Sequence, residues 1–230
     1  MYAVKDGKYV VTGKKSDYIY KDGGTTIFPR MYGREASHIA AYKEWGNISE
    51  NQAPEKLPTF GQNLRFFFSY QLGFMYGRYF MWNFAGRQND IQGHGGPING
   101  NWISGITALD EARLGPQDLP DSMKNRGRNT YYFLPLILGL VGMGFQWQRH
   151  RPDFWVTMML FFMTGIAIVI YLNQTPHQPR ERDYAYAGSF YAFTIWIGLG
   201  VMAIIESIPG KLRSKHIAAA ISAIDRKSVV

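Results

Sequence analysis

Three long stretches in the second half of the chain consist almost entirely of apolar and aromatic residues. Residues 131–147 and 154–172 contain no charged side chain, and residues 187–208 contain only Glu206. A helix needs about 20 apolar residues to cross the ~30 Å hydrocarbon core of a bilayer, with roughly 17 as the lower limit. The pattern therefore predicts three transmembrane helices in a membrane domain of residues 130–208. The alternative is three buried helices of a large soluble protein.

The polar and apolar positions of the first half predict shorter elements. Residues 2–5 and 8–11 flank the dipeptide Asp6-Gly7, which is a strong signal for a β-hairpin with a type I′ turn. This hairpin opens an irregular, polar extracytoplasmic region of residues 1–64. The fold class that follows is a mainly α-helical polytopic membrane protein with a short N-terminal hairpin.

An intensely aromatic segment, residues 65–85, follows the polar region. Arg65 and Arg78 leave only twelve uncharged residues between them, and this stretch is too short to span a bilayer. We therefore expect an interfacial helix that lies on the outer leaflet. A tilted additional span is the alternative, and it would invert the topology of everything upstream.

The composition of the chain excludes several classes of protein. Its 230 residues are 46% hydrophobic and 16% aromatic and include no cysteine, which excludes a disordered chain and a disulfide-stapled secreted domain. The net charge of +8 is spread over the chain without a basic stripe, so no nucleic-acid partner is expected.

The loops between the apolar stretches predict the orientation in the membrane. Residues 148–153 and 209–215 are basic, whereas residues 173–186 carry equal numbers of basic and acidic side chains. The positive-inside rule places the basic loops in the cytoplasm. Residues 1–129 and 173–186 are then extracytoplasmic, and residues 209–230 form a cytoplasmic basic loop with the start of a further apolar helix. No signal peptide opens the chain, so we expect a fragment of a longer protein whose earlier spans are missing.

Residues 86–129 form a glycine-rich extracytoplasmic loop. Its first twenty residues include six glycines among amide, charged and His side chains, so the loop is either mobile or organised around something polar. It lacks a complete dinucleotide-binding, Walker or esterase motif. Asp90 and His94 supply only two possible metal ligands, so no metal site is predicted. An unliganded surface loop is the competing interpretation.

The loop before the third apolar stretch carries a dense group of charges. Arg180 and Arg182 alternate with Glu181 and Asp183 at the expected outer surface of the membrane. The two carboxylates can simply complement the dipole of the following helix. Guanidinium groups also bind phosphate or pyrophosphate through paired hydrogen bonds. The arginines are therefore candidates for binding the phosphate of a lipid-linked donor.

Several segments of the chain together resemble one bacterial family. They are residues 79–84 (YFMWNF), 86–90 (GRQND), 100–105 (GNWISG), 164–169 (TGIAIV), 171–174 (YLNQ) and 178–193 (QPRERDYAYAGSFYAF). In this order they resemble the multi-pass membrane family catalogued as domain of unknown function 2723, which is common in Bacteroidota. The resemblance runs from about residue 28 to residue 200. That family is similar to the protein O-mannosyltransferases of the GT-C class, so the resemblance implies a GT-C-like fold.

The resemblance also implies an activity and a location. Enzymes of this class move a sugar, here expected to be mannose, from polyprenyl phosphate to Ser or Thr of exported proteins at the bacterial inner membrane. The expected partners are membrane lipids, the lipid-linked sugar and the exported acceptor proteins. No cofactor is expected, and the need for a divalent metal is left open.

The resemblance and the charge pattern nominate site residues. The catalytic carboxylate is expected upstream of this chain, so no catalytic residue is assigned and the fragment alone is expected to be inactive. The candidates for binding the donor phosphate are Arg87, Arg180 and Arg182. The candidates for lining the substrate groove are Asn89, Asp90, His94, Asn101, Trp102, Glu181, Asp183 and Tyr184.

The rival hypothesis is a non-catalytic membrane scaffold or a component of an export machinery. A transporter needs ionisable groups within its spans, and the predicted spans contain almost none. This argues against transport but leaves the scaffold open. An acidic residue on the outer side, just after the first span of the complete protein, would favour the enzyme.

Overall fold

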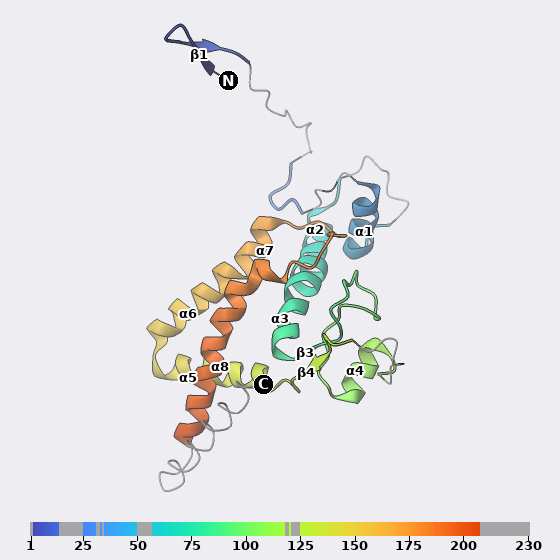
Figure 1. The fold of residues 1–230 in the computed structure, drawn as a ribbon, viewed down its shortest axis with the longest axis vertical. Helices are drawn as coiled ribbons and strands as arrows, with labels where there is room; N and C mark the ends of the chain where they lie inside the picture. The colour runs from blue at the N-terminus through green and yellow to red at the C-terminus, as the bar shows by residue number, and fades with distance from the viewer. Residues whose placement is uncertain are drawn as a thin grey trace.

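The structure is a computed structural model that describes residues 2–13, 25–30, 33, 35–49, 57–117, 120 and 125–207. Within these residues the chain is mainly helical, as expected (Figure 1). The predicted cytoplasmic region of residues 209–230 lies outside the described residues.

The N-terminal hairpin is confirmed. Strand β1 (Tyr2–Lys5) pairs antiparallel with strand β2 (Lys8–Val11). Asp6 and Gly7 between them both have positive φ angles, 51° and 74°, as a type I′ turn requires. Helix α1 (Ala36–Gly46) follows later in the chain.

The aromatic segment forms one continuous helical rod in three parts. These are α2 (Phe60–Phe66), the π-helix η1 (Phe67–Gly77) and α3 (Arg78–Phe84). The rod begins at a capping box, in which the Thr59 hydroxyl accepts from the backbone N–H of Gln62 and the Gln62 side chain accepts from the N–H of Thr59.

Phe60 and Phe68 are exposed, but the other aromatic rings of this rod face the protein interior. They form one buried cluster with aromatic residues of the last helix and the turn before it. Ring contacts join the rod to the last helix and to the turn before it. The Tyr76–Tyr186 ring centroids are 5.5 Å apart, and those of Phe84 and Phe193 are 4.6 Å apart. The rod therefore packs against the membrane-type helices, while its position relative to a lipid surface stays a prediction.

Among the described residues, two helical runs are long and apolar enough to cross a membrane. The first, Arg151–Leu172, consists of α6 (Arg151–Thr164) and α7 (Ile166–Leu172), which meet at a bend at Gly165. The second, Asp183–Ser207, consists of a short 3₁₀ turn, η3 (Asp183–Tyr186), and α8 (Ala187–Ser207). Large apolar side chains cover the outside of these runs and are exposed, for example Val156, Met163, Tyr191 and Met202. These runs correspond to two of the three predicted spans.

The first predicted span, residues 131–147, forms a helix that begins three residues later and is one residue shorter. Helix α5 (Leu134–Arg149) has 16 residues, which corresponds to a length of about 24 Å, less than the ~30 Å core of a bilayer. Tyr132 and Phe133 adopt positive φ angles, so the chain turns there and the helix begins only at Leu134. Helix α5 is therefore not among the helices of the described residues that are long enough to cross a membrane.

Helices α5 and α8 touch backbone to backbone at glycines. A Cβ atom on Gly142 would collide with the carbonyl oxygen of Trp196, and one on Gly200 would collide with that of Leu138. Small residues allow such close packing of helices where large side chains would hold them apart. This contact holds α5 against the second membrane-type run.

The glycine-rich loop contains more regular structure than predicted. Strand β3 (Gly86–Arg87) pairs antiparallel with β4 (Asn129–Thr130), and helix α4 (Thr107–Leu114) lies between them in sequence. Asp110 of α4 is buried, and its carboxylate accepts hydrogen bonds from the backbone N–H groups of Ser104 and Gly105, both at 2.8 Å. The helix was missed because its sequence is short and polar.

Candidate functional site

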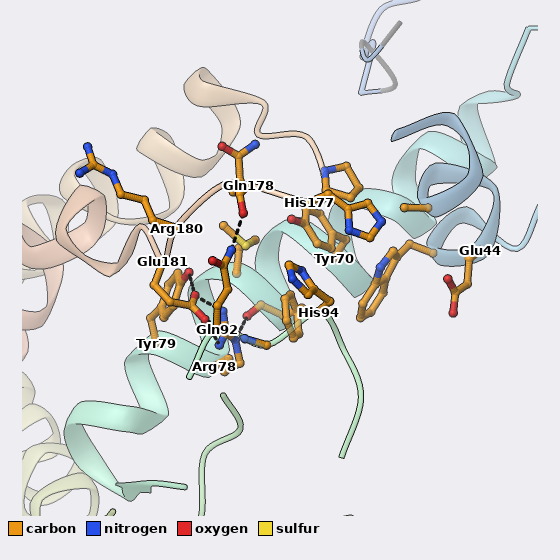
Figure 2. Close-up of a pocket in the computed structure, with 16 residues that line it drawn as sticks. Glu44, Tyr70, Arg78, Tyr79, Gln92, His94, His177, Gln178, Arg180 and Glu181 are labelled. Carbon is orange, nitrogen blue, oxygen red and sulfur yellow. Dashed lines mark hydrogen bonds and ion pairs between the residues drawn. The ribbon is translucent and has the colours of Figure 1, made fainter. Parts of the chain in front are cut away.

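A buried ion pair connects the aromatic rod to the α7–α8 loop, residues 173–182 (Figure 2). Arg78, the first residue of α3, is 4% exposed. Its guanidinium makes paired hydrogen bonds to Glu181, from Nη1 to Oε1 at 3.2 Å and from Nη2 to Oε2 at 2.8 Å. Its Nε donates to the Phe74 carbonyl at 3.0 Å, and Nη1 also donates to the Gly100 carbonyl at 2.6 Å. Such charge-assisted, bidentate pairs are the strong form of this interaction.

The carboxylate of Glu181 is fully occupied by protein groups. Besides Arg78, Oε1 accepts from the backbone N–H of Gly93 at 3.0 Å and Oε2 accepts from the hydroxyl of Tyr79. Burial acts to raise the pKa of Glu181, but the hydrogen bonds from Arg78 and Tyr79 and the Arg78 charge outweigh it, so the pKa is lowered. Burial is the main cause of the raised pKa of Tyr79. Glu181 therefore stays ionised and Tyr79 protonated at neutral pH.

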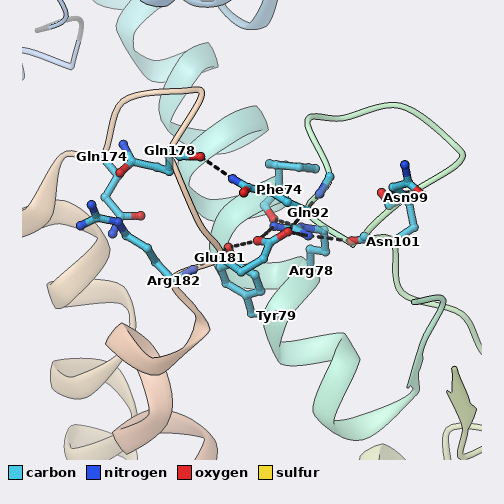
Figure 3. Close-up of polar contacts among 12 residues, drawn as sticks. Phe74, Arg78, Tyr79, Gln92, Asn99, Asn101, Gln174, Gln178, Glu181 and Arg182 are labelled. Carbon is cyan, nitrogen blue, oxygen red and sulfur yellow. Dashed lines mark hydrogen bonds and ion pairs between the residues drawn. The ribbon is translucent and has the colours of Figure 1, made fainter. Parts of the chain in front are cut away.

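The ion pair also holds the glycine-rich loop in place. Gly93 and Gly100 bind to Glu181 and Arg78 respectively, and Figure 3 shows the loop passing beside the pair. Next to them, the side-chain amide of Gln92 donates to the backbone carbonyl of Gln178. Two segments that are more than eighty residues apart in sequence are thus joined by several polar contacts.

Asn89 and Asn101, both predicted to line a substrate groove, support the loop from within. The Asn89 side chain accepts from the N–H of Gly100 at 2.8 Å and donates to the carbonyl of Ile98 at 3.2 Å. The amide of Asn101 donates to the carbonyl of Gly96 at 2.9 Å. The loop is therefore organised around its own amide side chains.

The other predicted residues of this loop also contact protein groups. The Arg87 guanidinium lies 4.0 Å from the centre of the Trp82 ring. The Arg113 guanidinium of α4 lies 3.5 Å from the centre of the Trp102 ring. Asp90 is exposed and accepts from the Asn125 amide at 2.6 Å. None of these three takes part in the ion pair with Glu181.

The two arginines of the α7–α8 loop point away from Glu181 (Figures 2 and 3). Arg180 is exposed, and its guanidinium lies 5.8 Å from the centre of the Tyr184 ring. Arg182 donates its backbone N–H to the hydroxyl of Tyr79 at 3.1 Å, while its buried side-chain Nε has no hydrogen-bond partner among the described residues. Asp183 and Tyr184 line a groove of about 420 Å³ beside the start of α8.

A small recess lies next to the ion pair, between α1, the rod and the two loops (Figure 2). Its volume is about 30 Å³, which is room for about one water molecule. Trp45, Tyr70 and Phe74 form its aromatic wall, and His94 and His177 lie at its polar side. The two imidazole rings have centroids 5.3 Å apart and planes inclined by 44°.

A second buried polar cluster centres on Gln71, which is 1% exposed. Its carbonyl oxygen accepts from Arg30 at 3.3 Å, and its amide donates to the Asn173 side chain and to the Gln174 backbone, both at 3.0 Å. This cluster fixes the end of α7 against the rod.

Sequence reasoning missed Arg78, Tyr79 and Gln71 as members of polar clusters. Arg78 was considered only as a charge that limits the length of an apolar stretch. A charge that is buried within an aromatic run needs a partner, so the position of Arg78 in this run was a signal that it belongs to a buried polar cluster. The sequence offered no means of choosing Glu181 as that partner.

Comparison with protein-family models yields a match to the first part of the chain. The model of a family of unknown function, DUF8416, matches residues 1–68, less than a third of the chain. No curated protein and no solved structure matches the chain. Arg78 and Glu181 both lie outside the matched residues.

Proposed function

We propose that this chain is part of an inverting membrane glycosyltransferase with a GT-C-like fold. It would move a sugar, mannose in the simplest case, from a polyprenyl-phosphate donor to Ser or Thr of exported proteins at the bacterial inner membrane. In this proposal α5 is a third, short span, and the catalytic base comes from a region upstream. Arg180 and Arg182 of this chain would hold the phosphate of the donor.

The observation that carries the proposal is the division of charge in the α7–α8 loop. Glu181 is neutralised by Arg78, so Asp183 is the one carboxylate of residues 173–186 that is left to balance the charges of Arg180 and Arg182. They directly precede a helical run that is able to cross a membrane. Guanidinium groups bind phosphate in paired hydrogen bonds, and they would stabilise the negative charge that develops on the departing lipid phosphate.

The groove beside α8 supports a lipid-linked substrate. Its lining combines aromatic rings with a few polar groups, and its members are Asn83, Phe84, Asp183, Tyr184, Ala187, Phe190, Tyr191 and Thr194. An apolar chain that continues from a phosphate held by the arginines would find aromatic surface there.

The test compares Ser/Thr glycans on exported proteins by intact-mass spectrometry. Deletion of the gene should remove a hexose-bearing glycan, and the wild-type gene should restore it. The Arg180→Ala/Arg182→Ala double variant should not restore it. The matched control is Arg149→Ala/Arg151→Ala, which removes two charges at the opposite end of the helices and should restore the glycan.

Two outcomes would contradict the proposal at different points. Unchanged glycans after deletion, in a strain without a redundant paralogue, would exclude the transferase and favour the scaffold. Full restoration by Arg180→Ala/Arg182→Ala would exclude the phosphate role of these arginines.

A further inference from the structure

We propose that Tyr79 is a positioning residue of the phosphate site. It fixes the backbone of Arg182, so that this arginine meets the phosphate group of a polyprenyl phosphate from a set position. The inference rests on the proposed function, because it deepens the role that Arg182 has there. Tyr79 acts through Arg182 and not on the donor itself, since its side chain is only 1% exposed.

The hydroxyl of Tyr79 joins two consecutive residues of the α7–α8 loop, Glu181 and Arg182 (Figure 3). It donates a hydrogen bond to Oε2 of Glu181 and accepts one from the backbone N–H of Arg182 at 3.1 Å. A tyrosine hydroxyl has one proton to donate and lone pairs that accept. Both hydrogen bonds can therefore form at the same time.

The charge of Glu181 fixes the direction of these two hydrogen bonds. The pKa of this carboxylate is lowered, so it is ionised at neutral pH, and an ionised carboxylate can only accept. The proton of the Tyr79 hydroxyl consequently points to Glu181, and its lone pairs face the N–H of Arg182. The buried pair of Arg78 and Glu181 thus sets the position of Arg182 through Tyr79.

The main chain of Arg182 is held on its other side as well. Its carbonyl oxygen accepts from the backbone N–H of Ala185 at 3.1 Å, in the 3₁₀ turn that opens the second membrane-type run. The side-chain Nε of Arg182, in contrast, has no hydrogen-bond partner among the described residues. The arginine therefore combines a fixed backbone with a donor that the described protein groups leave unused, as a preorganised binding site requires.

The ring of Tyr79 is held independently of its hydroxyl. Its centre lies 5.0 Å from that of the Trp82 ring and 4.4 Å from the Arg78 guanidinium. Tyr79→Phe keeps these ring contacts and removes only the two hydrogen bonds. Without them, Arg182 has to be ordered when phosphate binds, and ordering one flexible side chain corresponds to about three- to tenfold in affinity.

The test measures phosphate binding by the purified chain in dodecyl maltoside micelles, which contain no phosphate. Isothermal titration uses farnesyl phosphate, a short polyprenyl phosphate, and inorganic phosphate. Heat that remains with Arg180→Ala/Arg182→Ala is subtracted as partition into the micelle. Tyr79→Phe should bind farnesyl phosphate about three- to tenfold more weakly than the wild type does. Equal affinity of the wild type for the two probes would assign the site to free phosphate and overturn a lipid phosphate as its ligand.

The matched control is Tyr76→Phe. It removes the hydroxyl of another buried tyrosine of the rod, which donates to the Ser189 side chain at 3.2 Å, and it should bind farnesyl phosphate as the wild type does. A double variant separates positioning from a general loss of structure. Because Tyr79 acts through Arg182, Tyr79→Phe should have no further effect on affinity in an Arg182→Ala background. An equal additional loss in that background would overturn the inference.

A measurement on the wild type covers variants that fold poorly. Without phosphate, the amide of Arg182 should already be protected from hydrogen exchange, because it is bonded before the ligand arrives. Exchange at the rate of an exposed amide would contradict the positioning role. Unchanged binding by Tyr79→Phe, with binding by the wild type intact, would overturn this inference alone. Absence of phosphate binding by the folded wild type would overturn the phosphate role in the proposed function, and the inference with it.

Discussion

Removal of Glu181 should destabilise the protein strongly, because it leaves the charge of Arg78 buried. Without Glu181, the 4% exposed guanidinium retains, among the described residues, only the carbonyl oxygens of Phe74 and Gly100 as hydrogen-bond acceptors. Removal of one partner of a buried ion pair costs about 3–5 kcal/mol. Three aromatic rings within 4.6 Å of the guanidinium partly compensate. We therefore expect Glu181→Ala to lower the free energy of unfolding by about 3 kcal/mol.

Related variants separate the charge from the shape of this pair. Glu181→Gln keeps the shape of the side chain but turns one of its two acceptor oxygens into a donor that faces other donors. We therefore expect it to lower the free energy of unfolding by about 2 kcal/mol. The double variant Arg78→Met/Glu181→Leu removes both charges and should be more stable than Glu181→Ala. The matched control is Glu206→Ala, which breaks the more exposed pair with Arg149 at 3.1 Å and should cost less than about 1 kcal/mol.

The assay is unfolding in mixed micelles, by titration with sodium dodecyl sulfate and followed by circular dichroism. Equal losses for Glu181→Ala and Glu206→Ala would refute the reasoning, since burial would then make no difference. Arg78→Met and Glu181→Leu are also measured singly, and a double variant that loses the sum of these two losses would show that Arg78 and Glu181 do not interact.

Three further predictions test other contacts. The folded pKa of Glu181 lies below its ordinary value of 4.5, so its ionisation stabilises the fold above that pH, and this contribution is lost as the pH falls through the folded pKa. In thermal unfolding at decreasing pH, the unfolding temperature of the wild type should therefore fall more steeply than that of Glu181→Gln. Parallel curves would contradict this. Gly142→Ala should lower the free energy of unfolding by about 1–3 kcal/mol, because its Cβ would meet the backbone of α8. Gly144→Ala, with open space around the new Cβ, should leave it unchanged. Similar unfolding temperatures for the two variants would argue against the close helix contact. Asp110→Asn should cost about 2 kcal/mol and speed hydrogen exchange at the amides of Ser104 and Gly105, while the exposed neighbour Glu111→Gln should change neither quantity.

Local signals in the sequence were sufficient for several elements. Asp6-Gly7 adopts the positive φ angles that a type I′ turn needs, because these two residue types tolerate that conformation with little steric cost. The charge-free stretches predicted long helices in the second half, and two of these are long and apolar enough to cross a membrane. Their boundaries were less well predicted, since the chain turns at Tyr132 and Phe133 before α5 begins.

The partners of the polar residues depended on the tertiary structure. Arg78 and Glu181 are 103 residues apart, and only the packing of the aromatic rod against the α7–α8 loop brings them together. The same packing turns Arg180 away from Glu181 and places His94 beside His177. The composition and hydrophobic pattern of the sequence determined which segments are helical and apolar, because these properties are local. The tertiary structure decided which charges are neutralised inside the protein and which remain available to a ligand. A charge is neutralised only by a group that packing places within hydrogen-bonding distance.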